Sequence, residues 1–347
     1  MNQTGTNGKL IAWGRKALRF GLPLLIGYLI VTRIDFGILK TSFLGTKSYL
    51  FFLGLMHAPV LILLAVYRWK ELLQGYLRRH VPGGFALRQY WIGQALGFFT
   101  PASLGLDAYR IVAGGRQFGS YAKNTLIVLI EKVLALVTCM LIIVVLYPLV
   151  PRIVNGQVKD IVLIAYILLL VVLAVTGIVA LAGRNTVLSL LLGKLMGSIS
   201  RTMTSLGKRM GTGGEELEMS ISLKSLVEPL LSPRFLLVIL LSFGIQFVSS
   251  VKSQLYFVSL GYDVPFLVNL FVTPMIYFIF LLPVSLGSIG IREGVYIVLY
   301  GLFGVPAEIA LLVSFYNLLG ILLNNAVGGV FILFSRKGEQ PREAVSE

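Results

Sequence analysis

Two short loop motifs contain the residue types of this sequence that best suit an anion. Residues 98–110 read FFTPASLGLDAYR, and residues 280–292 read FLLPVSLGSIGIR. Both contain Pro-x-Ser-Leu-Gly and, after four more residues, an arginine. The matched pairs, each 182 residues apart, are Pro101 with Pro283, Ser103 with Ser285, Gly105 with Gly287, and Arg110 with Arg292. Because an arginine fork matches two phosphate oxygens and a glycine-rich loop exposes backbone N–H groups, the serines, glycines and arginines predict anion binding.

Other charged residues lie in or beside strongly apolar segments. A charge in the hydrocarbon core of a bilayer costs about 2.5 kcal/mol or more, so it marks an ion-pair partner or a functional path. The sequence leaves alternatives open: Arg110 in a cytoplasmic loop, Glu131 in a structural ion pair, and Lys252 reaching the outer surface. Lys132 points about 100° away from Glu131 on a helix, so each would pair with a different neighbour. The candidate ion-pair or gating residues are Asp107, Glu131, Lys132, Lys252 and Glu293.

The composition identifies an integral membrane protein. The chain has 347 residues, of which 56% are hydrophobic and 13% charged, and its mean hydropathy is +0.87. A net charge of +15 would suggest nucleic acid in a soluble protein, but here it predicts basic cytoplasmic loops beside anionic lipids. One cysteine excludes an intramolecular disulfide and a cysteine metal site, and two distant histidines argue against a histidine metal centre.

The apolar segments predict an all-α polytopic membrane protein with about six full transmembrane helices and two re-entrant or broken helical hairpins. A spanning helix needs about 20 mostly apolar residues. Pro and Gly interrupt residues 266–303, and residues 90–103 are too short to cross; whether the second broken segment fully spans is left open. Basic residues precede the first apolar run, but no small-residue cleavage site follows, so we expect an uncleaved span. The predicted spans are 17–32, 48–67, 124–147, 161–182, 235–259 and 306–334.

Basic residues predict the orientation of these spans. The segments assigned to the cytoplasm contain 22 Lys and Arg, against 5 in the outer loops. The cytoplasmic segments are 1–16 with Arg19, 68–123, 183–234 and 335–347, and the outer loops are 33–47, 148–160 and 260–265. The positive-inside rule therefore places both termini in the cytoplasm of a multi-pass cell-membrane protein. The linker 183–234 contains an amphipathic, basic stretch expected to lie on the inner leaflet. It is too short to form a catalytic core, so residues 1–347 are expected to form one membrane domain.

The loop motifs also predict an internal repeat. The first repeat lies around 48–147 with loop 98–110, and the second around 235–334 with loop 280–292. Three full spans lie between the two loops. Because this number is odd, the second repeat crosses the membrane in the opposite orientation to the first. Inverted repeats with broken helices are the usual construction of secondary transporters. The alternative is a pair of kinked helices with only a packing role.

Enzyme motifs are missing from the sequence. It contains no G-x-x-x-x-G-K-[ST], no H-E-x-x-H and no G-x-S-x-G. We therefore expect no bound ATP, no cofactor and no enzymatic activity.

Several motifs together resemble one family, the lysylphosphatidylglycerol synthase transmembrane-domain proteins, also called flippase-like membrane proteins. These are PASLGLDAYRIVAGGR, the following A-x-N…EKVLAL segment, LPVSLGSIGIREGVYIVLYGLFGVP and a closing Gly-Gly. The resemblance covers roughly residues 15–335. It implies loop arginines at Arg110 and Arg292, an acidic residue at Glu293, and an acid–base pair at Glu131 and Lys132. Asp107 departs from the pattern, because many members have Gly-Glu nearer the arginine.

The resemblance implies movement of a polar lipid between the membrane leaflets. In the multiple peptide resistance factor, this membrane part moves aminoacylated phosphatidylglycerol, and a soluble C-terminal transferase makes that lipid. This chain stops at residue 347, so we expect no synthase activity. Stand-alone members of the family are linked to hopanoid, glycolipid or polyprenyl-phosphate pathways.

We therefore predict an ATP-independent flippase for a polar, anionic, phosphate-bearing lipid, namely an anionic phospholipid, a glycolipid or a polyprenyl-phosphate. If transport is driven, Glu131 or Glu293 would take up the coupling proton. A lipid-synthase partner is possible, and nucleic acid is not expected. Two alternatives remain: a membrane enzyme or enzyme subunit that modifies a lipid-linked substrate, and a lipid-binding scaffold for a synthase.

Overall fold

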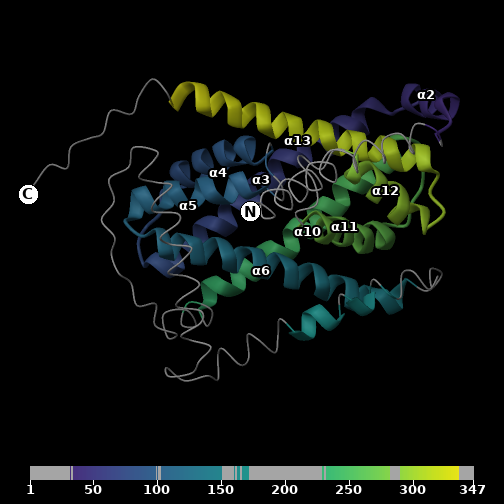
Figure 1. Cartoon of the computed structure of the whole chain (residues 1–347). Coiled ribbons are helices and arrows are strands. Elements are labelled where there is room, and N and C mark those ends of the chain that lie inside the picture. The colour runs from purple at the N-terminus through teal and green to yellow at the C-terminus, as the bar shows by residue number, and fades with distance from the viewer. Residues whose placement is uncertain are drawn as a thin grey trace, which may run out of the picture.

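A computed structural model shows a bundle of α-helices, with no strand among the residues that it describes (Figure 1). These residues are 32, 34–98, 100, 103–150, 160, 162–164, 166–171, 229, 232–281 and 290–335. The predicted span 17–32 lies almost wholly outside the described residues. The linker 183–234 lies outside them except at its last few positions, and the predicted span 161–182 is described only in part.

Among the described residues, four helices are long and apolar enough to cross a bilayer. Three of them begin and end within a few residues of the predicted spans. The fourth, α3, continues ten residues past the predicted end at residue 67. This extension turns residues expected in a cytoplasmic loop into part of the helical bundle. The four are α3 (Ser48–Leu77), α6 (Tyr121–Leu146, extended by a 3-10 turn over Tyr147–Leu149), α10 (Pro233–Ser259) and α13 (Ala307–Ser335).

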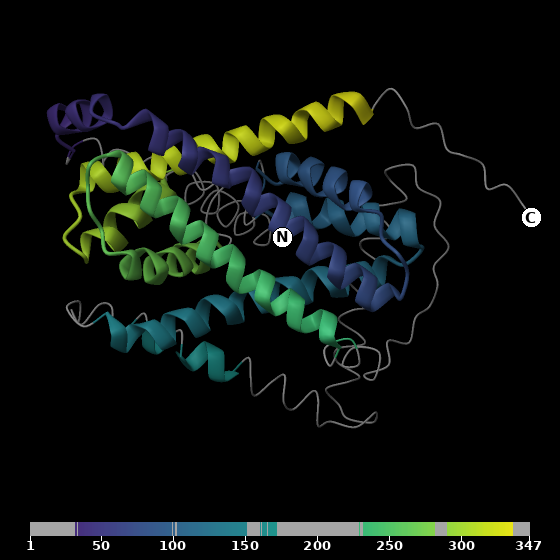
Figure 2. The ribbon, with the colours of Figure 1, turned by 180° about the vertical axis from the view of Figure 1, so that it is seen from behind.

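The helices α3 and α10 run side by side as an antiparallel pair, which faces the viewer in Figure 2. The backbone N–H of Lys47 donates to the carbonyl of Ser259 at 2.7 Å, and Arg68 reaches Ser242 near the other end of the pair. Gly54 permits the close approach, because a Cβ there would lie 2.6 Å from the ring of Tyr256. Small residues at contacts of this kind allow helix backbones to pack closely in membranes.

The first predicted loop, 98–110, is shorter in the structure: it spans the turn between two short helices, α4 (Gly83–Phe98) and α5 (Leu104–Phe118), and its residues from Leu104 to Arg110 belong to α5. The two helices pack against each other. At 16 and 15 residues, each is shorter than a bilayer crossing requires. Ser103 begins α5 with a left-handed backbone, φ 56°. A Cβ at Gly105 would lie 2.7 Å from the carbonyl oxygen of Leu96. Glycine is therefore needed for the two helices to meet at this turn.

The second half of the chain contains α11 (Phe266–Leu281) and α12 (Ile291–Gly301). The segment between them, which contains most of the second loop motif, lies outside the described residues. A further short helix, α2 (Phe36–Leu44), has Asp35 as its N-cap, and the backbone N–H of Asp35 donates to Glu308 at the start of α13.

In the part of the chain that the structure describes, two apolar clusters make up the core. One packs around Trp69, Leu73 and Ile127 of α3 and α6. The other packs around Phe257 and Phe271 of α10 and α11. Large apolar side chains also cover outward faces, as membrane lipid requires; examples are Leu236, Leu240, Phe247, Val298 and Leu333.

Candidate functional site

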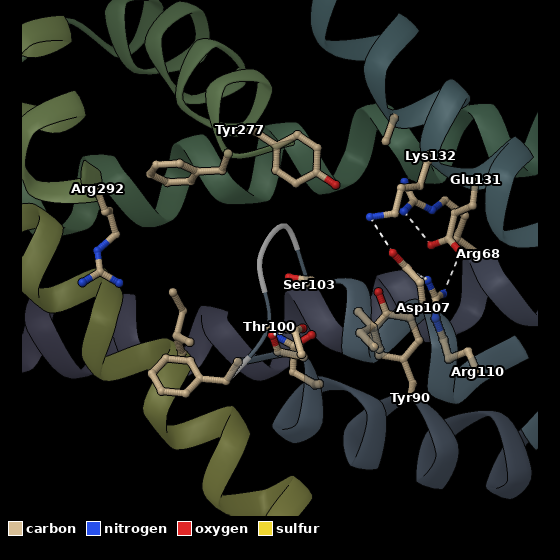
Figure 3. A pocket seen from close by; sticks show the side chains of 17 residues that line it. Arg68, Tyr90, Thr100, Ser103, Asp107, Arg110, Glu131, Lys132, Tyr277 and Arg292 are labelled. Carbon is tan, nitrogen blue, oxygen red and sulfur yellow. Dashed lines mark hydrogen bonds and ion pairs between the residues drawn. The ribbon is translucent and has the colours of Figure 1, made fainter. Parts of the chain in front are cut away.

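Charged residues from three helices meet inside the bundle. Glu131 of α6 accepts from two arginines, one on each carboxylate oxygen: Arg68 Nη2 lies 2.8 Å from Oε1, and Arg110 Nη1 lies 2.6 Å from Oε2. Arg110 Nη2 also donates to Asp107 Oδ1 at 2.9 Å. The second oxygen of Asp107 lies 2.6 Å from Lys132 Nζ. The charged cluster, defined as these five residues, thus links α3, α5 and α6 (Figure 3).

Most of the charged cluster is sealed from solvent and lipid. The exposed fractions are 6% for Arg68, 2% for Arg110, 3% for Glu131 and 6% for Asp107. Lys132 differs, because its side chain is 34% exposed. Buried charges survive in apolar surroundings only when opposite charges and hydrogen bonds compensate for lost hydration. The cluster meets that requirement, with Lys132 as its most accessible member.

Aromatic rings fix the position of Arg110. Its guanidinium lies 4.8 Å from the ring centre of Tyr90 on α4 and 5.4 Å from that of Trp69 on α3. A ring face attracts a cation, and the attraction strengthens where water is excluded. Arg110 is therefore held by two carboxylates and two rings. Within the described structure, its buried Nε and that of Arg68 have no hydrogen-bond partner.

A cavity of about 330 Å³ opens beside the charged cluster. The cluster forms one wall, and Phe98, Phe280 and Ile321 contribute apolar surface. Arg292 at the start of α12 lines the cavity on the side away from the cluster, as Figure 3 shows. The cavity therefore offers cations from both halves of the chain together with apolar surface.

Arg292 is held in place by its neighbour in the sequence. Glu293 accepts from Nε and Nη2 of Arg292. The other oxygen of Glu293 accepts from the backbone N–H of Gly290 at 2.6 Å, which caps α12. Arg292 is only 2% exposed, so it is a third buried arginine, and Glu293 is its carboxylate partner.

The sequence pattern that defines the family Lysylphosphatidylglycerol synthase TM region matches residues 16–328. The chain belongs to this family. The match is to the membrane region of the synthase proteins, a region associated with lipid translocation, and not to a catalytic synthase domain. It identifies a multi-pass membrane protein with a lipid substrate. A comparison with curated proteins gives no match.

Most of the predicted site residues of this family member meet at the cavity. The predicted site residues that line the cavity are Ser103, Asp107, Arg110, Glu131, Lys132 and Arg292. Gly105 does not line the cavity itself, but its N–H donates to Oγ1 of Thr100, a lining residue, at 2.7 Å. Ser285 and Gly287 lie outside the described residues. Lys252, on α10, does not line the cavity and makes no ion pair with a described residue.

The sequence interpretation missed Arg68, Trp69 and Tyr90. It counted Arg68 among the basic residues of a cytoplasmic loop, whereas the structure buries it against Glu131. The reason is the length of α3, which continues past the most apolar stretch. A signal was present, because Val66, Trp69, Leu73 and Tyr76 recur at helical spacing and are all buried.

The arrangement suits the binding of an anion. The described residues contain no group of three His, Cys, Asp or Glu that could hold a metal ion. Their acidic side chains at the cavity are engaged by arginine or lysine. A phosphate that entered the cavity would meet Lys132, the most exposed member of the charged cluster, on one side and Arg292 on the other.

Proposed function

We propose that this protein moves a polar, phosphate-bearing lipid between the leaflets of the cell membrane without ATP. One observation carries the proposal: a cavity inside an apolar helical bundle combines several buried cations with apolar surface. An anionic head group would use the cations. Its acyl chains would stay in the lipid phase, since a volume of about 330 Å³ suits a head group but not whole lipid chains.

The charge balance of the site supports an anionic head group. Four cations, Arg68, Arg110, Lys132 and Arg292, face three carboxylates, those of Asp107, Glu131 and Glu293. The formal excess is one positive charge, which a phosphodiester would neutralise. Charge-assisted hydrogen bonds from lysine and arginine are about twice as strong as neutral ones.

The helix boundaries support the internal repeat. Shifted by 182 residues, α3, α4, α5 and α6 fall on α10, α11, α12 and α13, and no boundary differs by more than seven residues. The shifted ranges are 230–259, 265–280, 286–300 and 303–328, against Pro233–Ser259, Phe266–Leu281, Ile291–Gly301 and Ala307–Ser335. The antiparallel contact of α3 with α10 suits an inverted relation, in which each pair of short helices forms a re-entrant hairpin.

The ion pairs provide a means of switching between inward-open and outward-open states. Glu131 joins α6 to both α3 and α5 through its two arginines. Lys132 joins α6 to α5 through Asp107. A phosphate that competes for Lys132 would weaken that second link and would favour a state in which α5 moves relative to α6.

A vesicle assay tests the function. Purified protein would be reconstituted with fluorescent anionic phospholipid, zwitterionic phospholipid or polyprenyl-phosphate, and a membrane-impermeant quencher would report the outer-leaflet fraction. We expect a phosphate-bearing anionic probe to cross faster than in protein-free vesicles. If no probe crosses, the proposal fails. A lipid product of altered mass would then indicate an enzyme, and tight binding without movement would indicate a scaffold.

A further inference from the structure

One face of α10 is polar along half of the helix and yet fully buried. Ser242, Gln246, Ser250 and Ser253 are between 0 and 3% exposed. Their spacing of four, four and three residues places them on one side of the helix. With a rise of about 1.5 Å per residue, this polar face extends over roughly 16 Å, about half the hydrocarbon thickness of a bilayer.

The polar face begins at the charged cluster and ends at a second polar network. At one end, Arg68 Nη1 donates to Ser242 Oγ at 3.3 Å. At the other end, Ser253 lies beside the hydroxyl of Tyr300. Tyr300 donates to Asn269 Oδ1 at 2.7 Å, and Asn269 donates in turn to Gln254. Polar groups therefore continue from the cavity into the half of the bundle formed by α11 and α12.

Ser242, Gln246 and Ser253 each contact a polar group of another helix, but these contacts use only part of the hydrogen-bonding capacity of the polar face. The hydroxyls of Ser242 and Ser250 donate to carbonyls of α10 itself, those of Val238 and Gln246, both at 2.9 Å. The Gln246 side chain contacts a weak acceptor, the sulfur of Cys139 on α6, at 3.1 Å. Alanine or leucine would pack a buried helix face in lipid without these polar groups.

The polar face also lies where the two repeats meet. Gln246 packs on α6 of the first repeat, while Ser253 packs near α12 of the second. If the repeats rock against each other, this boundary opens. From these observations, and resting on the function proposed above, we propose that the polar face of α10 is the path of the lipid head group past the bilayer centre.

The chemistry of the path fits a transported phosphate. Hydroxyl and amide groups replace part of the hydration that a phosphate loses in the membrane. They carry no charge, so they do not trap the anion as an arginine would. Transport requires binding that is strong enough to admit a substrate and weak enough to release it. The cations would hold the head group before the crossing, and the neutral path would let it pass.

Cysteine labelling tests the path. The chain has a single cysteine, so Ser250→Cys and Ser253→Cys would each be made in a Cys139→Ala background. Ala310→Cys is the matched control, because Ala310 is also 0% exposed but belongs to an apolar cluster. Each variant, reconstituted with the anionic probe that moves, would be treated with a charged, membrane-impermeant methanethiosulfonate, and lipid movement would be recorded before and after.

We expect Ser250→Cys and Ser253→Cys to react about ten-fold faster than Ala310→Cys, because a thiol reacts as its hydrated thiolate. Labelling should stop lipid movement in both. The path is refuted if the protein moves lipid while both cysteines react no faster than Ala310→Cys, or if full labelling leaves movement unchanged. Failure of the unmodified protein to move any probe would refute the proposed function and the path together.

Discussion

Lys132 and Arg292 lie on opposite sides of one cavity, although they are far apart in the sequence and belong to different halves of the chain (Figure 3). Each is held by one carboxylate, Lys132 by Asp107 and Arg292 by Glu293. Arg68 and Arg110, by contrast, share Glu131 and so connect α3 and α5 to α6. This arrangement separates cations suited to the substrate from cations that hold the helices together.

Glu131→Gln should destabilise the protein strongly. The change leaves two buried arginines without their shared carboxylate, and breaking a buried ion pair costs about 3–5 kcal/mol. Glu308→Gln is the control, since Glu308 is only partly buried and accepts one backbone N–H. Thermal unfolding in detergent should show a large decrease in Tm for Glu131→Gln alone. Equal Tm values for the two variants would mean that the charged cluster does not hold α3, α5 and α6 together.

Lys132→Met should weaken binding of the anionic head group while leaving the protein folded. The more exposed cation is lost, and a charge-assisted hydrogen bond contributes about 1.5–3 kcal/mol, or roughly ten-fold or more in Kd. Lys40→Met, at an exposed position of α2, controls for the change in net charge. Titration with a short-chain anionic lipid measures both. An unchanged Kd for Lys132→Met would remove this lysine from the site.

The ring of Tyr90, rather than its hydroxyl, should position Arg110. Its ring centre lies 4.8 Å from the guanidinium, and a buried cation–π contact contributes about 2 kcal/mol. Tyr90→Phe should therefore retain most of the thermal stability, whereas Tyr90→Leu should lower it. If both variants lose stability equally, the hydroxyl is the group that matters.

Gly328 and Gly329 should respond differently to alanine. A Cβ at Gly328 would overlap the backbone carbonyl of Trp91 on α4, whereas one at Gly329 would meet nothing within 4 Å. Overpacking costs about 1–3 kcal/mol, so Gly328→Ala should lower the Tm. Gly329→Ala should leave it equal or slightly higher, because alanine favours helix by about 1 kcal/mol. A lower Tm for Gly329→Ala alone would contradict the packing of α13 on α4.

The sequence was sufficient to predict three of the four long described helices and the break between α4 and α5. Apolar length determines a membrane span, so α6, α10 and α13 begin and end close to their predicted bounds. It could not predict that Arg68 reaches Glu131, 63 positions away in the chain. Which acid meets which base depends on how the helices pack, and hydropathy contains no information on pairing.

The repeat motif predicted that Arg110 and Arg292 would occupy one site, and both line the cavity. It did not predict their difference. Arg110 is surrounded by two carboxylates and two rings, while Arg292 has Glu293 as its carboxylate partner. The difference arises outside the motif, because the repeat mates of Glu131 and Lys132 are Val313 and Ser314, which carry no charge.

The most direct test of the central claim is the initial rate of anionic-lipid movement in vesicles containing Arg292→Ala. Arg79→Ala, at an exposed position just beyond α3, serves as the matched control. We predict that Arg292→Ala folds normally and loses at least about ten-fold in rate, as loss of a charged hydrogen bond to the substrate requires, while Arg79→Ala moves lipid at the unmodified rate. Equal rates for all three proteins would contradict a head-group site at this cavity.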